Sequence, residues 1–181
     1  MKNDLVKGQR SKVKGSAAGF SLVEMLFYIA ILSLALLVVT ETLLIMVRSY
    51  GSLRAAQQIA QDASLSLERM MREIRDANGT TDAESVLGLH PGELFLSTTD
   101  ARGAPRTVEF SLSNGQLVLK ENGVQSGALT STKTSITNMV FRKIVTARSK
   151  GVKIELSMRS GAGSAARSEN FHATAVLRDS Y

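Results

Sequence analysis

The chain has 181 residues, of which 44% are hydrophobic, a formal net charge of +6 and no cysteine. This length suits one modest domain with an attached helix, and the lack of cysteine excludes a disulfide-stabilised scaffold. Residues 1–19 contribute +4 of the charge, which leaves only +2 for the rest of the chain. The basic composition therefore gives little support to nucleic-acid binding.

Residues 1–19 form a basic leader with five Lys or Arg against one Asp, and it ends in Ser-Ala-Ala-Gly. Because basic residues beside a membrane-spanning helix stay in the cytoplasm, we expect a cytoplasmic N-terminus and an exported remainder. The small residues precede the apolar run, whereas in a secretory signal they follow it. An uncleaved signal anchor of the same orientation is the alternative.

An apolar run follows at residues 20–47, where the only formal charges are Glu24 and Glu41. About 20 such residues span a bilayer as a helix, so this segment predicts a single transmembrane helix. Glu41 would lie about 32 Å along the axis from Phe20, near the far interface. Glu24 would lie one turn inside the hydrocarbon, where an acid costs roughly 2.5 to 3.5 kcal/mol unless it finds a cation, becomes neutral or reaches the near interface.

The junction of leader and helix reads Gly19, Phe20, three residues Ser-Leu-Val, and Glu24. This pattern resembles that of the type IV prepilins and pseudopilins. The resemblance implies cleavage between Gly19 and Phe20 by a prepilin peptidase, N-methylation of Phe20, and pairing of Glu24 with the terminal ammonium of a neighbouring subunit. Major pilins commonly have a proline where this chain has Glu41, so the resemblance favours a pseudopilin or minor pilin.

The helical pattern continues beyond the apolar run. Apolar residues recur at steps of three and four, which predicts one helix over residues 21–77, ended by Asn78 and Gly79. The stripe consists of Leu53, Ala56, Ala60, Ala63, Leu67, Met70, Ile74 and Ala77. Such a helix would be about 85 Å long, so its apolar first half must pack on lipid or other helices. We expect the stripe to cover a sheet, with a coiled coil as the alternative and any bend near Gly51.

The last hundred residues predict strands, at 93–97, 107–112, 117–120, 139–144, 152–158 and 171–177. Asn114-Gly115 predicts a hairpin, Asn122-Gly123 repeats the signal, and residues 126–137 predict a loop. The last three strands should form a meander with turns at 149–151 and 160–164. The expected fold is α+β: a long N-terminal helix packed on a C-terminal antiparallel sheet. Its parts would be a leader 1–19, a transmembrane and assembly helix 20–47, and an exported domain 48–181 with an amphipathic helix 48–77 and a sheet 86–179.

The segment Ile-Thr-Asn-Met-Val-Phe at 136–141 and the Leu177-Arg178 ending also resemble the J-type minor pseudopilins. That resemblance implies the same order of strands in the exported domain.

Catalytic patterns are weak. His90 and His172 are isolated, and the sequence has no phosphate-binding loop, nucleophile elbow or spaced metal-ligand set, so we expect no enzyme activity, cofactor or metal. Asp82 and Glu84 could contribute to a calcium site but lack a coordinating-loop pattern. Basic residues on the late strands could contact a nucleic-acid backbone, although exposed lysines are common on edge strands. They are Lys143, Arg148, Lys150, Lys153 and Arg159.

Together with the apolar helix, the resemblance implies a structural subunit held in the bacterial inner membrane and assembled through its N-terminal helix into a type IV pilus or type II secretion pseudopilus. Expected partners are a prepilin peptidase, other pilin subunits and membrane lipid. The alternative is a binding module at a filament tip for DNA, a surface or a secreted substrate. The resemblance implies that subunits of a type IV pilus, a type II secretion system and a competence pseudopilus all share the Gly19 to Glu24 signature.

Overall fold

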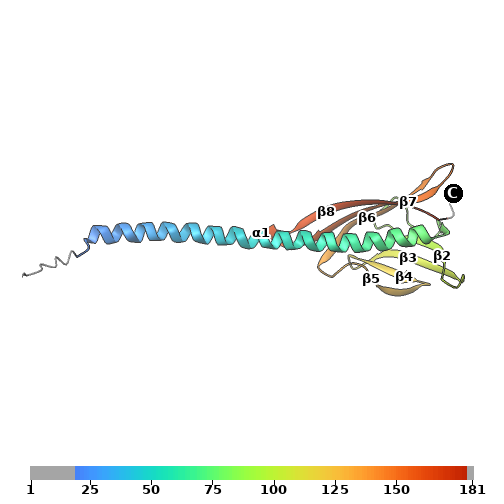
Figure 1. The fold of residues 1–181 in the computed structure, drawn as a ribbon, viewed down its shortest axis with the longest axis horizontal. Helices are drawn as coiled ribbons and strands as arrows, with labels where there is room; N and C mark the ends of the chain where they lie inside the picture. Colours follow the sequence, from blue (N-terminus) through green and yellow to red (C-terminus); the bar gives the residue numbers. More distant parts are fainter. Residues whose placement is uncertain (1–18, 179–181) are drawn as a thin grey trace, which may run out of the picture. The chain divides into compact units, whose positions relative to one another are not determined.

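A computed structural model of the chain describes residues 19–178 (Figure 1). The chain divides into two compact units, with the boundary between Leu44 and Ile45. The helix α1, Leu22–Asp76, contributes to both units. This confirms the predicted helix, whose expected ends at residues 21 and 77 differ by one residue each, and α1 stays regular through Gly51.

The first sheet has five antiparallel strands in chain order. They are β1 (Gly79–Thr80), β2 (Leu94–Thr99), β3 (Pro105–Ser113), β4 (Gln116–Glu121) and β5 (Val124–Ala128). Both predicted Asn-Gly turns form, because Asn114, Gly115, Asn122 and Gly123 all have positive φ. This is the backbone conformation that two-residue hairpins need, and it sets the register of β3 with β4 and of β4 with β5.

The prediction of a loop over residues 126–137 was wrong at its start, where the chain forms strand β5. Its sequence, Val-Gln-Ser-Gly-Ala, has little intrinsic strand preference, and four of its five residues are exposed. The strand forms because the Asn122-Gly123 turn folds it back onto β4, with a bulge at Leu119 and Lys120. The rest of that segment also enters a strand, since β6 begins at Thr134.

The second sheet is a three-stranded antiparallel meander of β6 (Thr134–Val145), β7 (Lys150–Ser160) and β8 (Arg167–Val176). The predicted meander is confirmed, although the first turn lies at 146–149 and a 3-10 turn, Gly163–Ala165, precedes β8. The prediction of a single sheet is replaced by two. The α+β class is confirmed.

The second half of α1 runs alongside both sheets (Figure 1). One hydrophobic core joins this part of the helix to the two sheets. Ile59, Met70 and Ile74 of the helix are fully buried together with Phe110 of β3 and Phe141 of β6. Alternate residues of β7 face this core, as expected for strands with one covered face. The amphipathic helix therefore covers sheets within its own chain, as predicted. For residues 53–77 this packing replaces the coiled coil that was the alternative.

The buried face of α1 differs from the predicted stripe. Leu53 and Ala60 are exposed, whereas Asp62, Ser66 and Glu73 are buried. The prediction counted only apolar residues as buried, whereas acidic residues can also lie on the buried face when they find hydrogen-bond or ion-pair partners. Glu73 lies between the guanidinium groups of Arg69 and Arg106, and Asp62 accepts hydrogen bonds from the side chain and backbone of Ser131.

Candidate functional site

The N-terminal end of α1 carries the residues that the sequence singled out. Gly19 and Phe20 precede the helix and are exposed, and the rest of the predicted leader, 1–18, lies outside the described residues. Ser21 is the N-cap: its Oγ accepts a hydrogen bond from the Glu24 backbone N–H at 3.2 Å. A Ser followed three residues later by Glu is a common helix-start pattern, so the motif also fixes where the helix begins.

Glu24 has a partner that the sequence analysis missed. The Tyr28 hydroxyl donates a hydrogen bond to Glu24 Oε1 at 3.0 Å. Four residues separate the two, which places both side chains on one face of the helix. That spacing was the available signal, and it passed unnoticed because Tyr28 reads as one more large residue of the apolar run.

The Tyr28 ring also meets Phe20. The two ring centroids are 6.1 Å apart and the planes are inclined by 80°, an edge-to-face contact of the kind that aromatic pairs favour. Phe20, Glu24 and Tyr28 therefore form one local group, with Phe20 lying just before the first helical residue.

The helix beyond this group exposes an almost continuous apolar surface. Every large hydrophobic side chain from Phe20 to Leu44 is between 51% and 81% exposed within the chain. Among the described residues, α1 is the one helix long and apolar enough to cross a membrane. A surface of this size needs lipid or other apolar helices to cover it, and Glu24 is its one acidic residue before Glu41.

The basic residues of the late strands are partly neutralised. Lys143 Nζ donates to Asp82 at 2.5 Å, and both Lys153 and Arg142 contact Glu155, at 2.9 and 3.2 Å. The hydrogen bond from Lys143 is the main cause that lowers the pKa of Asp82, and the one from Thr80 lowers it further. The hydrogen bond from Lys153 is the main cause that lowers the pKa of Glu155, and the one from Arg142 lowers it further.

The other residues considered for catalysis or metal binding are placed apart. His90 Nδ1 accepts a hydrogen bond from the Met139 backbone N–H at 3.0 Å, so His90 serves to join its loop to β6. His172 is exposed on β8, opposite Glu155 of β7. Asp82, one of the two acids weighed for calcium, is engaged by Lys143.

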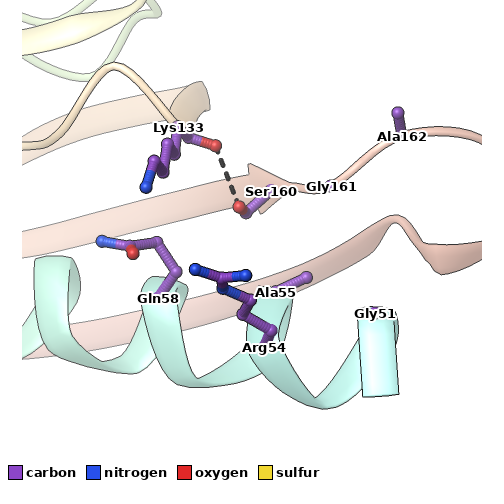
Figure 2. Close-up of a pocket in the computed structure, with 8 residues that line it drawn as sticks. All are labelled: Gly51, Arg54, Ala55, Gln58, Lys133, Ser160, Gly161 and Ala162. Atoms are coloured by element: carbon purple, nitrogen blue, oxygen red, sulfur yellow. Dashed lines mark hydrogen bonds between the residues drawn. The ribbon is translucent and has the colours of Figure 1, made fainter. Parts of the chain in front are cut away.

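A cavity of about 370 Å³ opens between the Gly51–Gln58 stretch of α1 and the end of β7 (Figure 2). Its lining includes two basic side chains, Arg54 and Lys133, and the amide of Gln58. Ser160 Oγ donates a hydrogen bond to the Lys133 carbonyl oxygen at 2.9 Å across its rim. The Ser160 hydroxyl is therefore engaged by a backbone acceptor of the same lining.

Comparison with known proteins gives one result for the N-terminal segment. Residues 14–40 match the family model of the prokaryotic N-terminal methylation motif. No curated protein and no solved structure matches the chain. The matched residues contain the whole group formed by Phe20, Glu24 and Tyr28.

The motif and the exposed apolar helix together indicate membrane anchoring and assembly of the pilus type. They also imply a prepilin peptidase and other pilin subunits as partners. The chain is therefore a type IV prepilin- or pseudopilin-like protein.

Proposed function

We propose that the chain is a minor pilin or pseudopilin, a structural subunit without enzyme activity that is assembled into a type IV pilus or a type II secretion pseudopilus. The observation that carries this proposal is the methylation motif at residues 14–40 on a helix whose apolar side chains are uncovered. The absence of a proline at Glu41 and the strand at residues 136–141 support the minor or J-type role.

The proposed mechanism begins with processing. Prepilin peptidase cleaves the peptide bond between Gly19 and Phe20 on the cytoplasmic face of the inner membrane, and Phe20 is then N-methylated. Cleavage creates an ammonium group at Phe20, next to an apolar surface that only lipid or another helix can cover. The subunit is then a single-pass membrane protein with its strands outside the cytoplasm.

Assembly transfers α1 from lipid to a bundle of similar helices. Since lipid and helix surfaces are both apolar, this transfer gains little from the hydrophobic effect alone. The Glu24 carboxylate supplies the specific term, because a desolvated acid is strongly stabilised by the Phe20 ammonium of a neighbouring subunit. Glu24 thus sets which helices pair and at what offset.

The test is Glu24→Ala in cells that carry the assembly machinery, with Glu41→Ala as the matched control on the same helix. We expect membrane insertion and leader cleavage to stay normal in both variants, and filament incorporation to fall only in Glu24→Ala. Normal incorporation of Glu24→Ala would refute the proposed role of this carboxylate.

The basic residues that suggested a binding module at the filament tip are partly engaged within the chain. Two of the lysines that suggested it, Lys143 and Lys153, are paired with carboxylates, so no specific observation favours DNA binding.

A further inference from the structure

We propose that Tyr28 is a positioning residue: its hydroxyl holds the Glu24 carboxylate in the orientation that receives the terminal ammonium of a neighbouring subunit. The inference rests on the proposed function and names a second residue on which the same contact depends. It is drawn from the hydrogen bond between Tyr28 and Glu24 and from the ring contact of Tyr28 with Phe20.

The hydrogen bond uses one carboxylate oxygen and leaves the other free. Tyr28 donates to Oε1 of Glu24 at 3.0 Å, and within the described residues Oε2 accepts no hydrogen bond. A carboxylate can accept several hydrogen bonds, so a second donor can bind Oε2 while Tyr28 stays in place. An incoming ammonium therefore adds to this contact and does not compete with it.

Tyr28 differs from the other hydroxyl-bearing residues further along this apolar segment. Ser33, Thr40 and Thr42 each donate to the backbone carbonyl four residues earlier, at 2.8 Å. Such bonds satisfy the hydroxyl locally and reach no other side chain. Tyr28 is the one whose hydroxyl is directed at an acid.

The ring of Tyr28 is held as well. Its edge-to-face contact with Phe20 restricts the ring, and this restriction directs the hydroxyl towards Glu24. The same contact packs the Phe20 ring against the Tyr28 ring, while the ammonium that Glu24 receives in the proposed function comes from a neighbouring subunit. Phe20, Tyr28 and Glu24 are thus arranged before any partner arrives, which reduces the ordering cost of pairing.

The hydroxyl should favour the assembled state over the free one. In the proposed assembly the Glu24 carboxylate contacts the ammonium of a neighbouring subunit, and the Tyr28 hydroxyl donates to the same carboxylate. Hydrogen bonds to ionised groups are roughly twice as strong as those between neutral groups. By holding the carboxylate in the orientation that the ammonium contacts, Tyr28 stabilises the paired state, and its removal should lower assembly.

The experiment compares Tyr28→Phe, which keeps the ring and removes the hydroxyl, with Tyr28→Leu, which removes both. Tyr50→Phe is the matched control, because Tyr50 is an exposed tyrosine of the same helix. We expect normal leader cleavage in all three full-length variants. The ratio of assembled to membrane-held subunit should fall about tenfold in both Tyr28 variants and stay unchanged in Tyr50→Phe. Wild-type assembly of Tyr28→Phe, or an increase, would overturn the proposal.

A second readout does not depend on assembly. In the full-length chain in lipid vesicles, the infrared band of the Glu24 carboxyl group is assigned by its loss in Glu24→Gln, and it should shift in Tyr28→Phe but not in Tyr50→Phe. An unshifted band would refute the hydrogen bond itself. If Glu24→Ala assembles normally, the proposed function fails; if only Tyr28→Phe does, the role of Tyr28 fails alone.

Discussion

Glu73 offers the sharpest test of what holds α1 to the first sheet. Its carboxylate is 7% exposed and contacts Arg69 at 2.8 Å and Arg106 of β3 at 2.5 Å, and Arg69 also contacts Glu121 of β4 at 3.1 Å. Glu73→Gln removes the charge between two guanidinium groups while keeping the side-chain volume. Breaking a fully buried pair costs about 3 to 5 kcal/mol.

The arginines are 32% and 25% exposed and both keep Glu121 nearby, so we expect a smaller cost of about 2 to 3 kcal/mol. The assay is amide hydrogen exchange of β3 and β4 in the detergent-solubilised full-length chain, because the detergent-bound helix would mask unfolding in a helical signal. The expected loss corresponds to roughly 30- to 150-fold faster exchange of the most protected amides.

The control for Glu73 is Glu68→Gln. Glu68 pairs with Arg72 on the same helix at 2.9 Å, but the two side chains are 63% and 57% exposed. Exposed pairs of this spacing contribute about 0.3 to 0.5 kcal/mol, so exchange should change by about twofold or less. Equal effects of the two substitutions would refute the reasoning that burial sets the value of the Glu73 network.

Two further predictions concern the contacts of β6. Gly92→Ala places a Cβ 3.0 Å from the Met139 carbonyl oxygen, so we expect the free energy of unfolding, measured by thermal unfolding, to fall by about 1 to 3 kcal/mol. Gly127→Ala is the control, because its Cβ meets open space and the free energy of unfolding should change little. Equal effects of the two substitutions would contradict the close approach at Gly92. Because Lys143 lowers the pKa of Asp82 below its ordinary 3.8, this ion pair stabilises the fold above that pH and is lost as the pH falls through the lowered pKa. Lys143→Met should raise the Asp82 pKa in a carboxyl NMR titration, and an unchanged value would disprove the pairing.

Local signals in the sequence predicted much of the fold. The apolar run and the three-four spacing predicted α1, Asn78 and Gly79 marked its end, and the hairpin turn at Asn114 set the register of two strands. Each of these features depends on residues close together in the chain, which is why reading the sequence could place them.

The features that were missed depend on distant partners. Glu73 and Asp62 are buried because Arg106 and Ser131, 33 and 69 residues away, supply their hydrogen bonds. Strand β5 forms through pairing with β4 against its own weak preference. Nothing in an apolar or polar pattern along the helix reveals such partners, so the predicted stripe placed the buried face incorrectly at Ala60.

At the candidate site the sequence predicted Gly19, Phe20 and Glu24 but not Tyr28. The first three belong to a motif whose order is recognisable in a linear sequence. Tyr28 gains its meaning only from the direction of its hydroxyl, which the structure shows aimed at the Glu24 carboxylate.

The measurement that tests the central claim most directly is the intact mass and N-terminal fragmentation of the chain extracted from membranes of cells with an active prepilin peptidase. We predict a mature chain that begins with N-methylated Phe20. A chain that still begins at Met1 would mean a plain signal anchor, and the proposed assembly through Phe20 and Glu24 would be wrong.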